Sequence, residues 1–355
     1  MLPKTICLFN HKGGVSKTTT AFNLGWSLAN LDKKVLLVDL DSQCNLTGLV
    51  LGFGAIDDAR MASFYSDKNN LTMQDIVNVI INGTQSPDSF IDGQAGELLQ
   101  TKHSNLFLLP GHLDVSDLDA QINVAMKVAS GLPVMRNTPG NLPSILQKIA
   151  SKNNFDYVIY DLSPNVGGLN EVILMSSDYF IVPASPDYFC LQAIGSLEKN
   201  IVKWYKEITR FKEDNKFNYV GYPIKNEPKF LGVIQQRYRP KNARPSLSFQ
   251  NWIDQIREEV NTNLIPSLRE RNCIVSDNKI SEVLKDSDIK PYDLAHISDF
   301  NSLIAMSQQY CKPIFELTDE EIGKQGEVLR LMGVSRDNFA KVFNELAERV
   351  IKLTD

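Results

Sequence analysis

A glycine-containing stretch at residues 10–20, N-H-K-G-G-V-S-K-T-T-T, constrains the fold of this chain more than any other part of its sequence. The apolar run before it, residues 5–9, predicts a buried strand, and the spacing of the apolar residues after it predicts a helix. A turn between a strand and a helix gathers its own N–H groups and the unpaired N–H groups of the first helical turn around one point. Because the helix dipole adds partial positive charge there, the stretch predicts an anion site.

Two side chains in this stretch indicate that the anion is a nucleotide. Lys17 would place a full positive charge beside the β- and γ-phosphates, and the Thr18 hydroxyl would complete the coordination of Mg²⁺. The usual phosphate loop, G-x-x-x-x-G-K-[ST], would have glycines where this chain has His11 and Ser16. A plain turn before a helix is the alternative, and the strand and helix predicted on either side argue against it.

The order K-G-G-V-S-K-T at residues 12–18 resembles the deviant loop K-G-G-x-G-K-[ST] of the ParA/MinD family of ATPases. Ser16 departs from that loop as well, and a Cβ atom is poorly tolerated if the position requires a positive φ. The resemblance implies ATP and Mg²⁺ as cofactors, with Lys12, Lys17 and Asp41 as catalytic residues. It also implies that the nucleotide lies on Lys12, Gly13, Gly14, Val15, Ser16, Lys17, Thr18 and Thr19.

Two further apolar runs end in carboxylates. Residues 35–38 precede Asp39 and Asp41, and residues 157–160 precede Asp161. Continuous apolar runs are typical of parallel strands that are covered on both faces. Ligands bind at the carboxyl ends of such strands, so we expect these aspartates to lie near the phosphates. The alternative is that strand-end aspartates only cap the loops that follow them.

The sequences around these carboxylates extend the family resemblance. Residues 41–48, D-S-Q-C-N-L-T-G, resemble the family sequence D-P-Q-G-N-A-T-G, with Cys44 in the place of a glycine. The resemblance implies that Asp41 orients the attacking water, and that Thr18, Asp41 and Asp161 hold the Mg²⁺ ion.

Composition limits the classes to which the chain can belong. Its 355 residues carry a net charge of −5, and its five cysteines are scattered without a C-x-x-C pair. No apolar run approaches the roughly 20 residues that span a bilayer, and no signal peptide precedes the first predicted strand. We therefore expect a cytoplasmic protein with neither a disulfide framework nor a zinc site. Since the net charge is negative, any contact with DNA must come from a local basic patch.

Two local clusters of basic residues could form such a patch. The first lies along one stripe of a helix predicted at residues 189–211, and the second follows a strand predicted at residues 230–234. A solvated surface is the alternative for each cluster. The expected DNA contacts are Lys199 and Lys203, in a stripe with Lys206 and Arg210, and Arg237, Arg239, Lys241 and Arg244.

These features predict a doubly wound α/β fold, with a mostly parallel sheet flanked by helices and residues 1–355 forming a single domain. A helical and loop-rich segment, residues 52–156, separates the acidic strands, and its Pro- and Gly-rich part at 131–143 predicts a loop. The last helix, residues 337–353, has one apolar stripe and a polar side of mixed charge. We therefore expect it to pack on the body of the protein rather than to lie on a membrane. Residues 290–305 resemble the region near the nucleotide base in relatives.

The resemblance implies an ATPase that forms a homodimer with ATP, in which Lys12 of each subunit reaches the phosphates of its partner. It further implies non-specific DNA binding on the nucleoid and weak hydrolysis stimulated by a ParB-like, cargo-linked activator. Such a cycle positions plasmids, chromosomes or other cargo. No helix–turn–helix segment precedes the loop, so operator binding is not expected. The alternatives are a MinD-like membrane-associated ATPase and a relative of the nitrogenase iron protein, whose cysteine positions this chain does not match.

Overall fold

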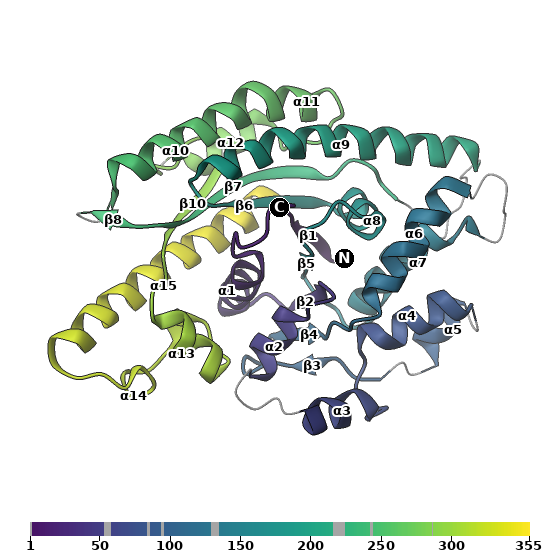
Figure 1. Cartoon of the computed structure of the whole chain (residues 1–355), viewed down its shortest axis with the longest axis horizontal. Coiled ribbons are helices and arrows are strands. Elements are labelled where there is room, and N and C mark those ends of the chain that lie inside the picture. Colours follow the sequence, from purple (N-terminus) through teal and green to yellow (C-terminus); the bar gives the residue numbers. More distant parts are fainter. Residues whose placement is uncertain are drawn as a thin grey trace.

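A computed structural model of the chain is drawn in Figure 1. The structure describes residues 2–52, 58–83, 86–93, 96–128, 135–215, 224–241, 244–285 and 287–355. Within these ranges, only the backbone is described for residues 58–61, 87, 240, 241 and 244.

Eight strands form one sheet at the centre of the molecule, in the order β10-β7-β6-β1-β5-β2-β4-β3. Neighbouring strands pair in parallel, except that β3 runs antiparallel to β4. A separate antiparallel ribbon is formed by β8 and β9. The strands are β1 (Lys4–Leu8), β2 (Val35–Leu40), β3 (Leu99–Gln100), β4 (Leu106–Leu109), β5 (Tyr157–Leu162), β6 (Tyr179–Ala184), β7 (Lys229–Tyr238), β8 (Pro240–Lys241), β9 (Arg244–Pro245) and β10 (Asp293–Ser298).

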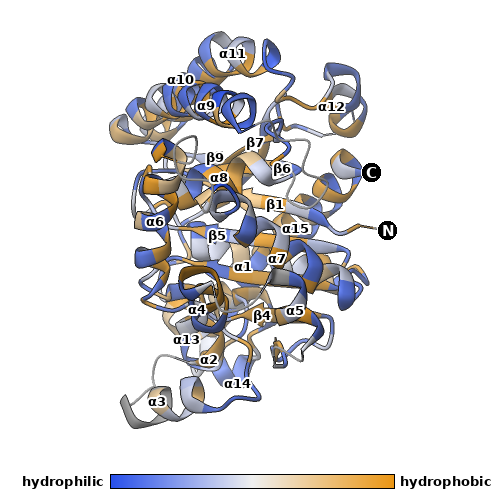
Figure 2. Cartoon of the chain, turned by 90° about the vertical axis from the view of Figure 1, so that its right-hand side faces the viewer, coloured by the Kyte–Doolittle hydropathy of each residue, from blue (hydrophilic) through white to orange (hydrophobic). Residues whose placement is uncertain are grey.

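The central strands are buried on both faces, which explains why their sequences are almost continuously apolar. Every residue of β2 and β5 is buried. Figure 2 shows hydrophobic residues concentrated on the strands and on the inward sides of the helices. Both strands continue past the ends predicted for them. As a result, Asp39 and Asp161 lie within strands rather than in the loops that follow.

Helices cover both faces of the sheet. On one face α1 packs against α15, and on the other α8 packs between α7 and α9 (Figure 1). This arrangement confirms the predicted doubly wound, mostly parallel α/β fold. A π-helical stretch, Val260–Leu264, joins α10 to α11. The helices are α1 (Lys17–Asn30), α2 (Asn45–Leu51), α3 (Asp58–Ser66), α4 (Met73–Asn82), α5 (Pro87–Asp92), α6 (Val115–Val128), α7 (Thr138–Lys152), α8 (Gly168–Ser176), α9 (Tyr188–Asp214), α10 (Leu247–Glu259), α11 (Ile265–Arg269), α12 (Asp277–Leu284), α13 (Leu303–Tyr310), α14 (Asp319–Ile322) and α15 (Gly326–Thr354).

The segment between the two acidic strands corrects one expectation. Helix α7 begins at Thr138, so the loop predicted over 131–143 is wrong from that residue onward. Pro139 occupies the first turn of α7. The backbone N–H groups of a first turn have no partner inside the helix, so a proline there begins a helix rather than breaking it. Residues 131–134 of the predicted loop lie outside the described residues.

Helix α15 packs its apolar stripe onto the body of the protein, as predicted, and starts earlier than the predicted residue 337. Phe343, Leu346 and Val350 are fully buried on this stripe. The helix ends beside the first strand, where Lys4 Nζ donates to Asp355 Oδ1 at 2.6 Å. None of the described helices is both long enough and apolar enough to cross a membrane.

Candidate nucleotide-binding site

The predicted phosphate loop lies where the sequence places it, between the end of β1 at Leu8 and the start of α1 at Lys17. Gly14 adopts a left-handed conformation with φ 73°, which glycine accepts without strain. Ser16 is also left-handed, with φ 60° and ψ 34°, and it stands at the N-cap of α1. The loop therefore does require a positive φ at the position where the family sequence has glycine.

Lys17 curls back into the loop that precedes it. Its Nζ donates to the backbone carbonyl of Asn10 at 2.9 Å and lies 3.5 Å from that of Lys12. Burial lowers the pKa of Lys17, while the nearby carboxyl groups of Asp161 and Asp41 oppose this effect. The side chain is therefore already held at the centre of the loop, facing the two strand-end carboxyl groups.

Asp161 is buried at the end of β5, with an exposed fraction of 1%. Burial, and next the charge of Asp39, raise the pKa of Asp161 to about 8. The Thr18 hydroxyl and Lys17 oppose part of that rise. Neither of the two carboxyl oxygens accepts a hydrogen bond of standard geometry from a residue in the described ranges. A buried carboxyl group with two open acceptors is costly unless something else occupies them.

A Mg²⁺ ion fits this donor set. Mg²⁺ prefers oxygen ligands and is usually held by one or two carboxylates together with substrate phosphates and water. Thr18, Asp41 and Asp161 offer such oxygens around the loop, and Asp41 Oδ1 otherwise accepts only the Gln43 N–H, at 3.1 Å, among the described residues. No group of three or more His, Cys, Asp or Glu side chains in the described ranges is placed to hold a metal ion.

Asp39 serves the scaffold instead. Its Oδ2 accepts the Thr47 N–H at 2.8 Å and the Thr47 hydroxyl at 2.7 Å, and this hydroxyl in turn accepts the Gly111 N–H at 2.8 Å. Burial raises the pKa of Asp39 to about 6, and these hydrogen bonds oppose the rise. Asp39 thus ties the end of β2 to the start of α2 and to the loop after β4.

Lys12 points away from the loop and contacts the start of α9. Its Nζ lies 2.7 and 2.8 Å from the two carboxylate oxygens of Asp187, and 3.4 Å from the Cys190 sulfur. The ring of Phe189 lies 5.7 Å from the same ammonium group. Asp187 also caps α9 by accepting the Cys190 N–H at 2.9 Å. Because Asp187 lies 175 positions from Lys12 along the chain, no sequence pattern indicates this partner.

The end of β7 also reaches the phosphate loop. Gln236 Nε2 donates to the Val15 carbonyl at 2.6 Å, and Arg237 Nη1 donates to the Gly14 carbonyl. Arg237 was expected on DNA, and the structure places its guanidinium against the loop. Gln236 was not predicted at all. A polar Gln-Gln-Arg sequence at the end of an apolar strand was the available signal.

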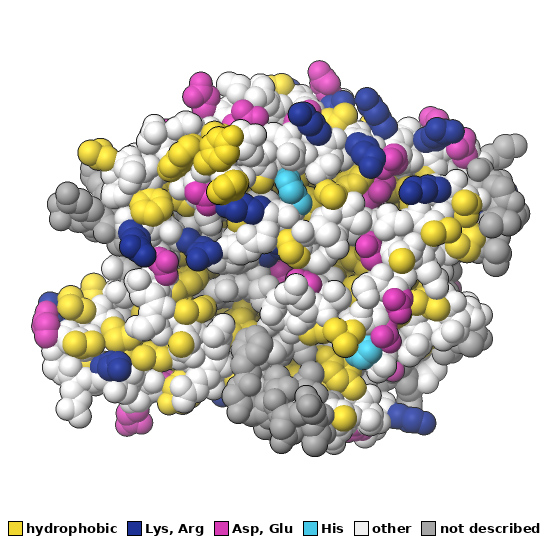
Figure 3. All heavy atoms as spheres, in the orientation of Figure 1, with side chains coloured by type: hydrophobic (Ala, Val, Ile, Leu, Met, Phe, Trp, Pro, Cys, Tyr) yellow, Lys and Arg dark blue, Asp and Glu magenta, His cyan; other side chains and the backbone are white. Residues whose placement is uncertain are grey.

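The other expected DNA contacts divide into two groups. Lys199 and Lys203 are exposed on α9, and Lys203 Nζ lies 3.8 Å from Glu207 Oε1. Figure 3 shows basic side chains over α9 with acidic ones between them. Arg239, which follows β7 directly, is exposed. The side chains of the remaining two, Lys241 and Arg244, lie outside the described part of the chain.

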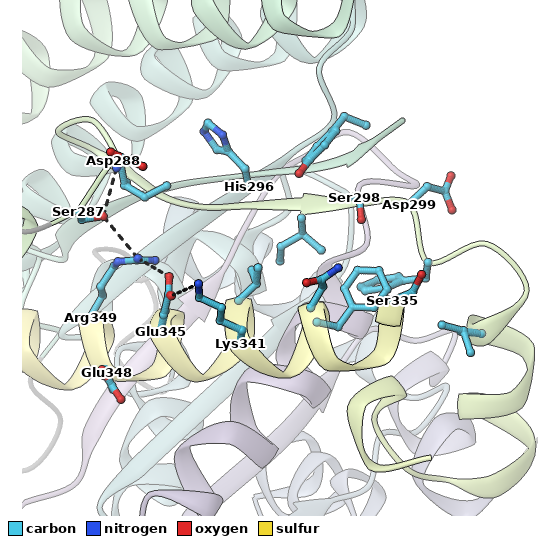
Figure 4. Close-up of a pocket in the computed structure, with 18 of the residues that line it drawn as sticks. Ser287, Asp288, His296, Ser298, Asp299, Ser335, Lys341, Glu345, Glu348 and Arg349 are labelled. Atoms are coloured by element: carbon cyan, nitrogen blue, oxygen red, sulfur yellow. Dashed lines mark hydrogen bonds and ion pairs between the residues drawn. The ribbon is translucent and has the colours of Figure 1, made fainter. Parts of the chain in front are cut away.

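A large groove of about 1600 Å³ runs between β10 and α15. Figure 4 shows His296 and Ser298 on the strand side and Ser335, Lys341 and Glu345 on the helix side. The groove is also lined by Tyr238, the residue after Arg237, and by residues 299–303, which connect β10 to the start of α13. The region expected near the nucleotide base, 290–305, thus contributes to this wall, and its contact with a base stays a prediction.

Comparisons with known proteins agree with this geometry. The sequence model of a family described as AAA domain (AAA_31) matches residues 3–213, which is more than half of the chain. The chromosome partitioning protein ParA of Myxococcus xanthus is 29% identical over 199 residues, which are 56% of this chain and 58% of that protein.

Two solved structures share the fold. An ATP complex of a Cyanothece McdA variant superposes with a TM-score of 0.58 at 17% identity, covering 98% of this chain and 96% of that one. The Pyrococcus furiosus cell division ATPase MinD gives a TM-score of 0.51 at 18% identity, covering 99% of this chain and 100% of that one. The matching family model and the phosphate loop at the end of β1 lead to one conclusion: this chain belongs to the ParA/MinD family of P-loop ATPases.

Proposed function

We propose that this protein hydrolyses ATP in a Mg²⁺-dependent reaction and that ATP binding drives it to form a homodimer. The observation that carries the proposal is the meeting of three buried side chains at one loop: Lys17, Asp41 and Asp161. Neither Asp161 oxygen accepts a hydrogen bond of standard geometry from the described residues. Family membership supports the proposal, and so does the ATP bound to the McdA variant named above.

Each of these residues has a distinct part in the proposed reaction. Lys17 and the loop N–H groups would bind the β- and γ-phosphates and stabilise their developing charge. Thr18 and Asp161 would hold Mg²⁺, which neutralises charge on the phosphates when it is bound. Asp41, which follows β2 directly, would orient the water that attacks the γ-phosphate.

Lys12 would act across the dimer interface. In the single chain it pairs with Asp187 and so does not face its own phosphate loop. In the dimer it would leave Asp187 and reach the phosphates of the partner subunit. A cation supplied in this way follows the logic of an arginine finger, which is worth roughly 10³–10⁵ in rate.

The test replaces Lys12 by Ala. The variant should lose ATP-dependent dimerisation, measured by light scattering with ATP and with ADP, and its turnover should fall at least about 100-fold. Lys68→Ala, which removes an exposed lysine, is the matched control. Persistence of both dimerisation and turnover in Lys12→Ala would show that the cross-interface role is wrong.

The dimer would bind DNA without sequence preference and position cargo, with a ParB-like partner stimulating hydrolysis and release. This proposal rests on the expected role of the exposed α9 stripe and of Arg239, which follows β7, and on the partitioning role named for the Myxococcus relative. Because binding releases counterions from DNA, affinity should fall steeply with salt. The protein would then be found in the cytoplasm, on the nucleoid.

A double substitution, Lys199→Gln with Lys203→Gln, tests the α9 contact. ATP-dependent retention on DNA should weaken, and the slope of log affinity against log salt should shrink by about 0.9 for each phosphate that the variant no longer neutralises. The same preparation is also measured on anionic liposomes. An unchanged affinity and slope on DNA would exclude the stripe, and ATP-dependent retention on liposomes alone would favour the membrane-associated alternative.

A further inference from the structure

The last residues of β7 hold two consecutive carbonyl groups of the phosphate loop. Gln236 is 1% exposed, and its amide bridges two parts of the site. Its Nε2 donates to the Val15 carbonyl at 2.6 Å, while its Oε1 lies 3.0 Å from the Thr20 hydroxyl. Arg237 Nη1 donates to the carbonyl of the residue before, Gly14.

These contacts set the direction of two N–H groups. In a trans peptide the carbonyl of one residue and the N–H of the next point in opposite directions, and the described chain has no cis peptide bond. With the Gly14 and Val15 carbonyls turned toward β7, the N–H groups of Val15 and Ser16 point away from it. These are donors of the kind that cradle phosphates in such loops.

Hydrogen bonds also hold the peptide planes on both sides of Ser16, the strained residue of the loop. The peptide before Ser16 is held through the Val15 carbonyl by Gln236. The peptide after it is held through the Ser16 carbonyl, which accepts the Thr20 N–H at 2.9 Å and the Thr20 hydroxyl at 2.8 Å. Ser16 lies between these two fixed peptide planes, so its left-handed φ of 60° is imposed by its neighbours rather than by its own preference.

Arg237 itself departs from ordinary backbone geometry. Its φ is 67°, a left-handed conformation that an arginine adopts only where its surroundings impose it. Such strained residues gather at functional sites. The guanidinium contacts the loop although the side chain is exposed and free to extend into solvent.

We propose that Gln236 and Arg237 are positioning residues for nucleotide phosphates. They clamp the loop so that the Val15 and Ser16 N–H groups face the phosphates, and they replace the conformational freedom that a glycine at position 16 would give. This inference rests on the proposed nucleotide binding and names which residues outside the loop make it possible.

Arg237→Gln is the primary test, with Arg330→Gln as the matched comparison. Each removes one charge from an exposed arginine, but Arg237 reaches the phosphate loop, whereas Arg330 lies on α15 and donates to Glu327. We expect the dissociation constants of fluorescent ATP and ADP analogues to rise about tenfold in Arg237→Gln and to stay within about twofold of wild type in Arg330→Gln. Both nucleotides should be affected, because the β-phosphate that the loop N–H groups would hold is present in ATP and in ADP.

A second measurement links the clamp to Ser16. In a chain that already carries Ser16→Gly, the loop can keep its conformation without help, so the same Arg237→Gln change should cost about threefold or less in affinity. Gln236→Leu removes the amide's hydrogen bond to the Val15 carbonyl and its contact with the Thr20 hydroxyl. It should weaken nucleotide binding as Arg237→Gln does, and the loss should likewise be smaller in the Ser16→Gly chain. A cooperative thermal unfolding transition, measured for each variant without nucleotide, serves as the control that the variant is folded.

The outcomes separate the clamp from the proposed function. If the wild-type chain binds neither nucleotide, the proposed function fails and the clamp fails with it. If the wild type binds and Arg237→Gln binds equally well, the clamp alone is wrong. Weaker binding confined to ATP would overturn it in favour of a direct contact with the γ-phosphate. If Arg237→Gln weakens retention on DNA while its nucleotide affinity is unchanged, the clamp is wrong and Arg237 contacts DNA instead.

Discussion

Two residues beside the candidate site occupy backbone conformations that suit glycine. Ser16 precedes α1 with φ 60°, and Cys44 precedes α2 with φ 52°. The family sequences have glycine at both positions, so the chain carries a Cβ twice where the backbone is left-handed. Each such residue costs on the order of 1–2 kcal/mol relative to a right-handed conformation. The phosphate loop and the loop after Asp41 therefore both hold strain that their surroundings must offset.

Relieving this strain should stabilise the protein. We expect Ser16→Gly to raise the free energy of unfolding by about 1 kcal/mol relative to Ser16→Ala, because glycine accepts a left-handed φ and alanine does not. The serine side chain makes no capping hydrogen bond, so Ser16→Ala should lie close to wild type. Denaturant unfolding of the three chains measures the difference. Equal stability of the glycine and alanine variants would show that the strain is absent.

Glu171 on α8 makes the stability of the protein depend on pH. It is 6% exposed, its Oε1 has no partner among the described residues, and burial raises its pKa to about 8 from an ordinary 4.5. Between these two pH values the folded chain binds a proton that the unfolded chain has released. Stability from this group is therefore present below about pH 4.5 and is lost as pH rises toward 8.

Glu171→Gln should remove the fall in stability between about pH 4.5 and pH 8, since a neutral amide of similar shape does not ionise. We expect the variant to match wild type near pH 5 and to be more stable by up to a few kcal/mol at pH 9, at about 1.4 kcal/mol for each unit of pKa shift. Thermal unfolding at pH 5, 7 and 9 gives the comparison. Parallel curves for the two chains would contradict the assignment.

At this scale the sequence identifies residues whose chemistry depends on their neighbours along the chain. Lys17 and Thr18 lie in the first turn of α1, and Asp161 lies at the end of β5, so a recognisable strand–loop–helix pattern and a recognisable strand end bring the three together. The ion pair between Lys12 and Asp187 could not be predicted, because it depends on the position of α9 relative to the phosphate loop. Arg237 was assigned to DNA for its charge alone, although a charge pattern does not say which way a side chain turns.

At the scale of elements, apolar periodicity predicts the long helices and the buried strands. Helix α6 is an example, because its buried residues Val115, Leu118, Ile122 and Ala125 follow one face. The prediction of a loop over 131–143 is wrong at the start of α7, because proline and glycine are typical of loops, whereas Pro139 occupies the first helical turn. The early start of α15 was missed for another reason: Val328, Leu331 and Val334 leave apolar side chains exposed and blur the pattern.

The two ends of α15 should respond differently to truncation of a side chain. Phe343 is fully buried and contacts the rings of Phe300 and Phe315 at centroid distances of 6.4 and 5.7 Å. Phe343→Ala should cost about 3–5 kcal/mol of unfolding free energy, because it leaves a cavity in the core. Leu331 is 54% exposed, so Leu331→Ala should change stability by less than about 0.5 kcal/mol. Similar losses in both variants would show that the first half of α15 also packs against a partner.

At the scale of the whole molecule, the order of the strands in the sheet determines which segments meet at the candidate nucleotide site. Placing β1 between β5 and β6 brings together the phosphate loop, the carboxyl end of β5 and the start of α9. The end of β7 then reaches the loop from beyond β6, 221 positions along the chain from Val15 to Gln236. No sequence pattern specifies that neighbourhood, since strand order depends on how all of the crossover helices pack. The fold class was therefore predictable, while the outer parts of the site were not.

Because the site joins segments from distant parts of the chain, nucleotide binding should stabilise the molecule as a whole. A ligand at 100 times its dissociation constant adds about 2.7 kcal/mol to the unfolding free energy. For a chain of this size that corresponds to a rise of roughly 3–5 °C in Tm. We expect this rise with ATP and Mg²⁺, and a smaller one when a chelator removes the ion, because the open oxygens of Asp161 then lack their partner.

Asp161→Asn separates the two contributions. The amide keeps the shape of the carboxyl group but binds Mg²⁺ weakly, so ATP should raise Tm by the same amount with and without the ion. Asp67→Asn, which changes an exposed aspartate, is the control and should respond to Mg²⁺ as the wild type does. If the Mg²⁺ increment survives in Asp161→Asn, the ion is held elsewhere. The two Asp161 oxygens, which accept no hydrogen bond of standard geometry from the described residues, must then have another function.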